Sequence, residues 1–393
     1  MTPQETDSQT NSDVSPPPST SSIDPTKIHH IADHKHERPL TTCRVDPSGK
    51  FAFAGAEDLN VYRWDLESGE KTVLAGHQSW VRSMDFSPDG QWLYTAGWEG
   101  QIRSWEVAAE SPVTLNVIQA HRGCARWVQS SPCGQMLTTC GNDKRIRVWD
   151  AASGKQIVEL SGHRRHPYAV LFHPTDGHLV SEDLMGIIRV WDPQQLIETN
   201  LIDASVMTGY DNKFAADMGG ARDMCFSSDG STLACAGITA VVNSFAGEQD
   251  PIVVLVDWQS KAVTHYLKQT ERKAGIMWGV RCHPAGFVVG AVALQGGGGQ
   301  LLFWQPAASH ATNAPVNESD QTAGDQQAQT APELAGEPIE LKPYHTFALP
   351  NCARGMDFTS DARRVVIAHA NGNLGVYEMA EKTDDSAAEP TAS

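Results

Sequence analysis

Four histidines each lie 28 positions before a tryptophan, and this spacing runs through the first half of the chain. A fixed offset that recurs indicates one structural unit copied along the sequence. The fold must therefore be an array of similar units. The four pairs are His36 and Trp64, His77 and Trp105, His121 and Trp149, and His163 and Trp191.

Each unit also carries a short turn rich in serine, aspartate, proline and glycine. An aromatic or apolar residue follows each turn at the end of the unit, and in the last three units this residue is Val256, Trp304 or Tyr377. The seven turns indicate seven units, although the sequences of the last three units have diverged. They are Asp46–Gly49, Ser87–Gly90, Ser131–Gly134, His173–Gly177, Ser227–Gly230, His283–Gly286 and Thr359–Ala362.

Between these marks, apolar and polar residues alternate with a period of two, as in Val81–Phe86 and Ile146–Trp149. This alternation predicts short strands joined by tight turns. Each unit has room for four strands and no helix, which is typical of a propeller blade. A four-stranded sheet cannot bury both of its faces alone, so the sheets must stack around a ring. The sequence therefore predicts an all-β fold, a seven-bladed β-propeller of four-stranded antiparallel blades.

The chain resembles the WD-repeat β-propeller family from about Lys27 to Met379. In the first four units a histidine, a serine or threonine, an acidic residue and a tryptophan recur in order. The resemblance implies that these side chains bond to one another within the blade, so they are not a catalytic triad. The third unit has the complete set, whereas Ala54 replaces the hydroxyl in the first unit and Met185 replaces the acid in the fourth. The complete set is His121, Thr139, Asp143 and Trp149.

The last unit lacks an outer strand, because residues 379–393 are polar, acidic and rich in alanine. Residues near 26–32 precede His36 much as Lys71–Leu74 precedes His77. We expect this N-terminal strand to complete the last blade and close the ring. The predicted propeller covers residues 26–379. Disordered segments are expected at 1–25, 380–393 and, as an insertion between the third and fourth strands of a blade, at 306–338.

Composition limits the location and partners of the chain. The net charge of −17 argues against general nucleic-acid binding. No basic start with an apolar run and no stretch near 18 apolar residues is present, so we expect no secretory signal and no membrane partner. Eight cysteines without a CxxC pair suit a reducing compartment. We expect a cytoplasmic protein that is monomeric or part of a hetero-complex.

One position in each unit faces a mouth of the central channel, on the side of the loops that join successive blades. It lies five places after the histidine or at the equivalent point, and it holds Thr41, Arg82, Arg126, Tyr168, Arg222, Trp278 and Arg354. Trp80 and His166 occupy the neighbouring ring position, and Trp98 points the same way. The predicted partner-binding residues are Trp80, Arg82, Trp98, Arg126, Tyr168, Arg222, Trp278 and Arg354.

Arginine binds carboxylate or phosphate through paired hydrogen bonds, and aromatic rings add stiff apolar contact. The sequence thus favours a non-enzymatic interaction scaffold that binds an acidic or phosphorylated protein segment. A simpler alternative is that these arginines only solvate strand ends. Two other functions remain open: a hydrolase-like propeller enzyme with carboxylates converging on the channel, and a scaffold that binds through blade edges or tails. No GxSxG, HExxH or P-loop motif is present, and we expect no catalytic residue, cofactor or metal.

Two surplus segments, 203–220 and 239–250, are expected to rise beside this mouth. Met207, Tyr210, Phe214 and Met218 could form a lid or an apolar contact patch there, or the segment could be an excursion without function. Four histidines crowd residues 29–36, but strand alternation separates neighbours, which argues against a metal site.

Overall fold

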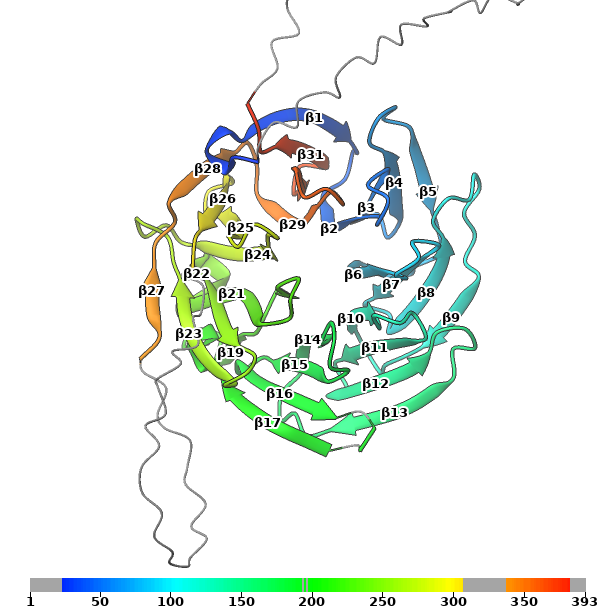
Figure 1. Cartoon of the computed structure of the whole chain (residues 1–393), viewed down its shortest axis with the longest axis horizontal. Coiled ribbons are helices and arrows are strands. Elements are labelled where there is room, and N and C mark those ends of the chain that lie inside the picture. Colours follow the sequence, from blue (N-terminus) through cyan, green and yellow to red (C-terminus); the bar gives the residue numbers. More distant parts are fainter. Residues whose placement is uncertain (1–22, 193, 196, 307–336, 382–393) are drawn as a thin grey trace, which may run out of the picture.

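The computed structural model describes residues 23–192, 194–195, 197–306 and 337–381 of the 393-residue chain. These residues form strands and turns, with three short 3₁₀ helices: η1 (Pro25–Lys27), η2 (Ser205–Met207) and η3 (Ser244–Ala246). Among them, no helix has the length and hydrophobicity that crossing a bilayer requires. Figure 1 shows the strands arranged as blades around a central axis.

Seven antiparallel sheets make up the ring, and in six of them the chain runs from the innermost strand outward. This arrangement confirms the predicted seven-bladed propeller. Blade 1 contains β2 (Leu40–Val45), β3 (Phe51–Ala56), β4 (Val61–Asp65) and β5 (Lys71–Leu74). Blade 2 contains β6 (Val81–Phe86), β7 (Trp92–Gly97), β8 (Gln101–Glu106) and β9 (Asn116–Gln119). Blade 3 contains β10 (Ala125–Ser130), β11 (Met136–Gly141), β12 (Arg145–Asp150) and β13 (Gln156–Ser161).

The second half of the ring is less regular. Blade 4 contains β14 (Pro167–Phe172), β15 (Leu179–Asp183), β16 (Ile187–Asp192) and β17 (Ile197–Asp203). Blade 5 contains β20 (Asp223–Phe226), β21 (Thr232–Asn243), β22 (Glu248–Asp257) and β23 (Ala262–Leu267). Blade 6 contains β24 (Gly275–Cys282), β25 (Val288–Leu294), β26 (Gly299–Trp304) and β28 (His345–Leu349). Blade 7 contains β29 (Ala353–Phe358), β30 (Arg364–His369), β31 (Asn373–Glu378) and β1 (His29–Lys35).

The two ends of the propeller meet in blade 7. Strand β1 pairs antiparallel with β31, from His29 opposite Glu378 to Lys35 opposite Asn373. The predicted closure by an N-terminal strand is therefore confirmed. The strand lies three residues later than predicted, because η1 occupies Pro25–Lys27 and the N–H groups of Lys27 and Ile28 donate within this turn, to Asp24 O and Pro25 O.

Two elements were not predicted. Strand β27 (Ile339–Leu341) adds a fifth, parallel strand to the outer edge of blade 5, with Ile339 opposite His265. Strands β18 (Thr208–Asp211) and β19 (Ala216–Gly219) form a separate hairpin in the surplus segment between blades 4 and 5. As predicted, the long insertion joins the third and fourth strands of blade 6, β26 and β28. Most of that insertion and of the two predicted tails lies outside the described residues.

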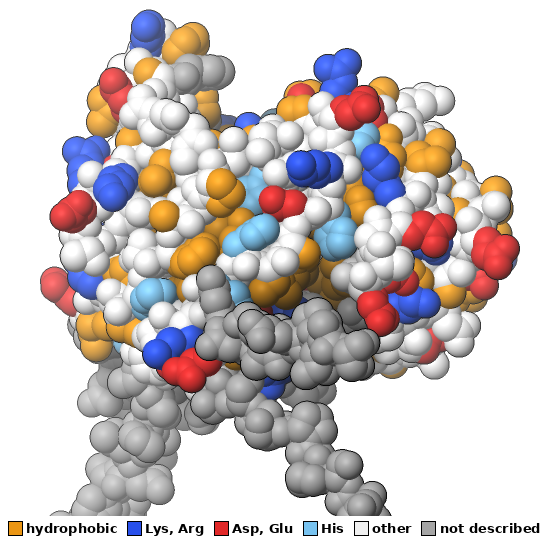
Figure 2. All heavy atoms as spheres, turned by 90° about the horizontal axis from the view of Figure 1, so that it is seen from above, with side chains coloured by type: hydrophobic (Ala, Val, Ile, Leu, Met, Phe, Trp, Pro, Cys, Tyr) orange, Lys and Arg blue, Asp and Glu red, His pale blue; other side chains and the backbone are white. Residues whose placement is uncertain are grey.

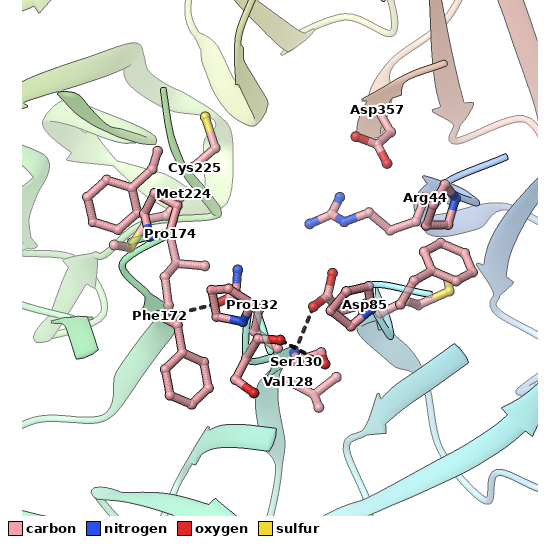
Figure 3. Close-up of a pocket in the computed structure, with 18 of the residues that line it drawn as sticks. Arg44, Asp85, Val128, Ser130, Pro132, Phe172, Pro174, Met224, Cys225 and Asp357 are labelled. Atoms are coloured by element: carbon pink, nitrogen blue, oxygen red, sulfur yellow. Dashed lines mark hydrogen bonds between the residues drawn. The ribbon is translucent and has the colours of Figure 1, made fainter. Parts of the chain in front are cut away.

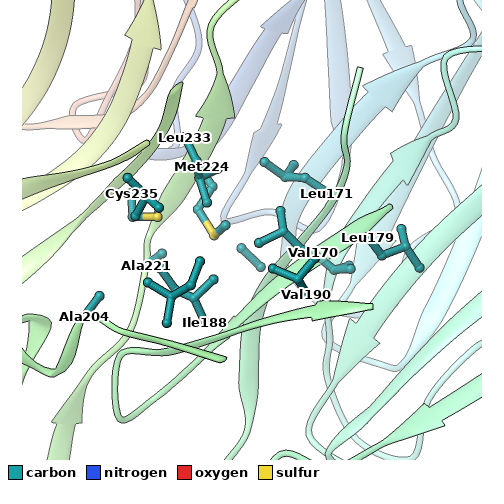
Figure 4. Close-up of a cluster of buried hydrophobic side chains, with 14 of the residues drawn as sticks. Val170, Leu171, Leu179, Ile188, Val190, Ala204, Ala221, Met224, Leu233 and Cys235 are labelled. Atoms are coloured by element: carbon teal, nitrogen blue, oxygen red, sulfur yellow. The ribbon is translucent and has the colours of Figure 1, made fainter. Parts of the chain in front are cut away.

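Neighbouring blades share apolar interfaces. Between blades 4 and 5, the side chains of Val170, Leu179 and Ile188 pack in one cluster with Leu233 and Cys235, and all five are fully buried (Figure 4). Burying a side chain of this size contributes about 1.5–3 kcal/mol. Each sheet therefore buries both of its faces only because it has a neighbour on each side.

The repeated histidine belongs to a buried hydrogen-bond chain inside its blade. In blade 3, Trp149 Nε1 donates to Thr139 Oγ1 (2.9 Å), the Thr139 hydroxyl donates to His121 Nε2 (2.8 Å), and His121 Nδ1 donates to Asp143 Oδ1 (2.8 Å). Burial lowers the pKa of His121 despite the hydrogen bond and charge of Asp143, which act in the opposite direction. The chain thus holds a neutral imidazole in a structural role.

Blade 4 completes the same chain by a different route. As the sequence indicates, Met185 occupies the position where the other blades have their acid. Asp183, two residues earlier, supplies the carboxylate instead: it accepts from His163 Nδ1 (2.9 Å), and Ser181 bonds to His163 Nε2 (2.7 Å). The Asp183 carboxylate also accepts from the backbone N–H of Met185, so it caps the turn as well.

The rim of the ring near β1 shows acidic and basic side chains interspersed with histidine and hydrophobic ones (Figure 2). On β1, His30 Nε2 lies 3.1 Å from Asp33 Oδ1, whereas His34 is buried. The described residues contain no group of three or more histidine, cysteine or acidic side chains that could hold a metal ion.

Candidate functional site

A β-bulge marks the mouth position in six of the seven blades. The strand register shifts at Thr41, Arg82, Arg126, Tyr168, Trp278 and Arg354. A bulge re-aims the side chain of its extra residue and bends the strand. Blade 5 has no such shift, and its mouth residue, Arg222, directly precedes β20, with its N–H donating to Ala236 O (2.6 Å).

Four arginines and two aromatic rings meet at this end of the channel, and we call this set the arginine mouth. The guanidinium carbons of Arg82, Arg354 and Arg222 lie 4.5, 5.4 and 5.7 Å from the centre of the Trp278 ring. The structure thus brings together residues of six blades that the sequence had placed on one ring. The same carbons of Arg126 and Arg222 lie 4.1 and 4.9 Å from the centre of the Tyr168 ring.

The positive charge of the arginine mouth has no carboxylate partner among the described residues. Arg126 Nε donates to the neutral Asn142 side chain (2.6 Å), and the buried Nε of Arg222 finds no acceptor. Burial, together with the charges of Arg354, Arg222 and Arg126, lowers the pKa of Arg82 to about 9. Cations packed this closely, with one buried N–H that has no acceptor, favour a bound anion.

A buried carboxyl group, Glu182 on β15, lies near the arginine mouth but does not neutralise it. Its side chain is fully buried beside the Cys235 thiol. Burial raises the pKa of Glu182 to about 8 against the hydrogen bond from Cys235, and the charge of Asp183 acts in the same direction as burial. Glu182 is therefore mostly protonated at neutral pH. No pattern in the sequence points to this residue.

Two exposed tryptophans flank the arginine mouth. The rings of Trp80 and Trp98 are 5.4 Å apart and are 36% and 37% exposed. Trp80 Nε1 donates to Glu57 O (3.2 Å), and the Trp98 N–H donates to Trp80 O (3.0 Å), which fixes the pair. Trp80 lies two residues before Arg82, so an apolar surface adjoins the cationic one. We call this pair the tryptophan clamp.

Thr41 does not contribute a free group to the mouth, although it was predicted to belong to the ring. Its side chain is buried, and its hydroxyl donates to Val81 O in the next blade. Thr41 therefore joins blades 1 and 2.

The hairpin β18–β19 lies beside Tyr168. The left-handed Gly220 (φ 77°) at its base packs so closely that a Cβ atom there would lie 3.0 Å from the Tyr168 ring. Tyr210 is half exposed, but Met207, which was predicted to join a lid or contact patch, is fully buried. Its η2 turn inserts the side chain into the core between blades 4 and 5.

A second ring lies deeper in the channel, three residues after each mouth position. Arg44, Arg281 and Asp357 of this ring form a salt-bridge network with Asp223: Arg44 to Asp223 (3.3 Å), Arg281 to Asp223 (2.6 Å) and Arg281 to Asp357 (2.8 Å). Asp223 belongs to this network although it directly follows Arg222. The ring residues line a cavity of about 500 Å³ toward the opposite face (Figure 3): Arg44, Asp85, Gln129, Leu171, Cys225, Arg281 and Asp357.

The carboxylates of this network also join adjacent blades. Asp357 accepts from the Val45 N–H (3.0 Å), Asp223 from the Val280 N–H (3.1 Å), and Asp85 from the Ser130 N–H (2.7 Å). Two of the three are also paired with arginine. The network thus braces the wall beneath the arginine mouth. The repeated spacing could have revealed this ring from the sequence.

Comparisons with known proteins agree with this architecture. The family model "WD domain, G-beta repeat" matches residues 69–106 and 112–150. The chain is 30% identical to Periodic tryptophan protein 2 of Arabidopsis thaliana over 217 residues, which is 52% of this chain and 19% of the relative. It is 37% identical to Polyadenylation factor subunit 2 of Gibberella zeae over 173 residues, which is 43% of this chain and 28% of the relative.

A shorter match, 37% identity over 71 residues, joins 18% of this chain to 20% of the Mitotic checkpoint protein bub-3 of Caenorhabditis elegans. The alignments thus span under a third of each of these three relatives. The matched repeats fall in blades 1 to 3, where the histidine and tryptophan pattern is most regular. The chain thus forms a seven-bladed propeller, and its regular blades carry repeats similar to those of the WD-repeat β-propeller family.

Proposed function

We propose that this propeller is a protein-interaction scaffold whose arginine mouth binds an anionic segment of a partner protein. The observation that carries this proposal is the cluster of four guanidinium groups on Tyr168 and Trp278, with no carboxylate partner among the described residues. A carboxylate or phosphate would balance this positive charge and accept hydrogen bonds from the guanidinium groups.

The surroundings of the arginine mouth favour a protein segment over a free ion. The tryptophan clamp offers two partly exposed rings next to Arg82, and aromatic side chains of this kind are enriched at the centres of protein interfaces. The partner segment would place its anionic group among the arginines and an apolar side chain on the clamp. The match to a polyadenylation factor subunit supports a role in an assembly of proteins.

The scaffold role also fits the rigidity of the site. The arginine mouth is carried by the innermost strands of several blades, and the salt bridges of Arg44 and Arg281 brace those strands from below. Groups that are already in place lose little conformational freedom when a ligand binds. We also propose a cytoplasmic location, which the eight free thiols support.

A display library of random peptides, with and without treatment by a protein kinase mixture, tests this proposal. The wild-type protein is the bait. The Arg126→Glu/Arg222→Glu double variant is a second bait, and peptides that bind to both are discarded because they bind outside the arginine mouth. We expect enriched peptides to contain aspartate, glutamate or phosphorylated residues, with an apolar residue nearby. Enrichment of neutral or basic peptides, or of the same peptides on both baits, would refute the proposal.

A further inference from the structure

Two cysteines from adjacent blades lie side by side in the wall of the channel. Cys225 is on β20 of blade 5 and Cys282 ends β24 of blade 6, and their sulfur atoms are 3.8 Å apart. The remaining six cysteines, whose thiols are also free, make no such sulfur contact among the described residues. A disulfide needs the sulfur atoms at about 2.05 Å, which a rotation of these side chains could reach from this separation.

Cys225 is partly buried and lines the channel cavity. It belongs to the deeper ring of the channel and lines the cavity of about 500 Å³, in which Figure 3 shows its sulfur on the blade 5 wall. An oxidant can thus approach this sulfur from the face opposite the arginine mouth. Cys235, in contrast, is fully buried in the same blade.

The two thiols differ in acidity. The hydrogen bond with Cys282 lowers the pKa of Cys225, and the positive charge of Arg281 lowers it further. Burial acts in the opposite direction and raises this pKa. The same hydrogen bond, with burial, raises the pKa of Cys282 well above its ordinary value. Cys225 is therefore the thiol that becomes a nucleophilic thiolate first, and Cys282 keeps the proton until the second step.

We propose that Cys225 and Cys282 are a redox modification site, at which a peroxide converts the two thiols into a disulfide that joins blades 5 and 6. This site is separate from the arginine mouth and does not depend on what the mouth binds. The disulfide would tie β20, which Arg222 directly precedes, to β24, which carries Trp278; these two mouth residues lie three and four positions from the cysteines.

The reaction proceeds in two steps. The Cys225 thiolate attacks one oxygen of hydrogen peroxide, the O–O bond breaks, and Cys225 becomes a sulfenic acid while the other oxygen leaves as water after taking up a proton. The Cys282 sulfur then attacks the Cys225 sulfur, the S–O bond breaks, and the Cys282 proton leaves with the hydroxyl as a second water. Two thiols lose two electrons and two protons in total, and one peroxide becomes two waters.

The test exposes the purified full-length chain to graded hydrogen peroxide, followed by alkylation of the remaining thiols and mass spectrometry of the digest. The exposed Cys133, which is hydrogen-bonded to Ser131 and has no cysteine neighbour, reports the oxidant dose. We expect a Cys225–Cys282 cross-linked peptide to form at doses that leave most Cys133 reduced. Dithiothreitol should reverse it, and the oxidised protein should have a higher Tm than the reduced protein.

Two variants separate the steps. In Cys282→Ser the Cys225 sulfenic acid should accumulate and react with dimedone, and in Cys225→Ser, Cys282 should remain alkylatable. If either serine variant fails to fold, the alanine variant replaces it, and the wild-type cross-link remains decisive. Absence of the cross-linked peptide at doses that fully oxidise Cys133 would overturn the proposal, as would equal dimedone labelling of Cys225 in wild type and Cys282→Ser.

Discussion

Arg82 of blade 2 extends across the channel so that its guanidinium carbon lies 4.5 Å from the centre of the Trp278 ring of blade 6. Arg222 and Arg354 approach the same ring. A cation over an aromatic face gains about 0.5–2 kcal/mol, more when water is excluded. The single ring of Trp278 therefore holds three of the four mouth arginines in place.

Replacing Trp278 should weaken anion binding although every positive charge remains. In Trp278→Ala the three arginines lose the surface that orients them, and we expect the affinity for a peptide selected by the wild-type mouth to fall roughly 10-fold, about 1.4 kcal/mol. Trp278→Phe keeps an aromatic face and should retain most of the affinity. Fluorescence anisotropy of the labelled peptide measures both, and unchanged binding by the alanine variant would argue against the stacking role.

The tryptophan clamp should contribute apolar contact without contributing to the fold. Trp98 is 37% exposed, so Trp98→Ala should leave the Tm within a few degrees of wild type. We expect the same variant to weaken binding of a selected peptide by about 1–2 kcal/mol. The control is a peptide whose apolar residue is changed to serine: it should bind wild type and Trp98→Ala equally. A difference between the two proteins for that peptide would show that the clamp acts in another way.

The hydrogen-bond chain of blade 3 predicts a large loss of stability from a small change. Thr139→Val preserves shape but leaves Trp149 Nε1 without an acceptor and His121 Nε2 without its donor. Each buried group left unpaired costs about 1–3 kcal/mol, so we expect a loss of about 2–4 kcal/mol in urea unfolding. Thr199→Val, at an exposed position on β17, should change stability by less than about 0.5 kcal/mol. Similar values for the two variants would contradict the proposed role of the chain.

Glu182 predicts a specific dependence of stability on pH. Its pKa is about 8 in the folded protein against an ordinary value of 4.5, so between these values the folded state binds more protons than the unfolded state. Stability must then fall as the pH rises through this window, by up to about 1.4 kcal/mol per unit. Glu182→Gln cannot ionise, so the Tm of wild type should fall relative to this variant from pH 5 to pH 8. If the Tm of the two proteins changed with pH in parallel, Glu182 would be ionised in the folded state.

If β1 closes the ring, two N-terminal deletions should differ in their effect on the Tm. Removing residues 1–35 takes away β1 and leaves the β31 edge unpaired, so we expect the Tm to fall by on the order of 10 °C or more. Removing residues 1–22 leaves η1 and β1 intact and should have little effect. Equal effects in thermal unfolding would mean that β1 does not close blade 7 in solution.

The fold could be predicted because its signals are local and repeated. The spacing from His121 to Trp149 recurs, and the turns recur even where the tryptophan is lost, as at Val256. The start of β1 was harder to predict, because the 3₁₀ turn Pro25–Lys27 before it is anchored by a long-range contact, the hydrogen bond from the Asp24 N–H to Met379 O. Strand β27 could not be predicted, since it joins blade 5 from an insertion in blade 6.

The ring of mouth residues could be placed from the sequence, but the contacts among them could not. Repeat alignment placed Arg82 and Trp278 on one ring, but only the closed ring shows that they touch. From the sequence, Met207 is an apolar residue in a loop. It is buried because of the η2 turn, which no sequence pattern indicated. The salt bridge of Arg44 with Asp223 joins blades 1 and 5, which no short-range pattern can pair.

Capture of partners from native cell extract tests the central claim most directly. Arg126→Glu/Arg222→Glu reverses two charges in the mouth, whereas Lys50→Glu/Lys155→Glu makes the same charge change at exposed lysines in turns on the opposite face. Both variants should keep nearly the wild-type Tm. We predict that at least one partner is captured by wild type and by the lysine variant but lost from the arginine variant. Identical sets of partners for all three proteins would contradict the account.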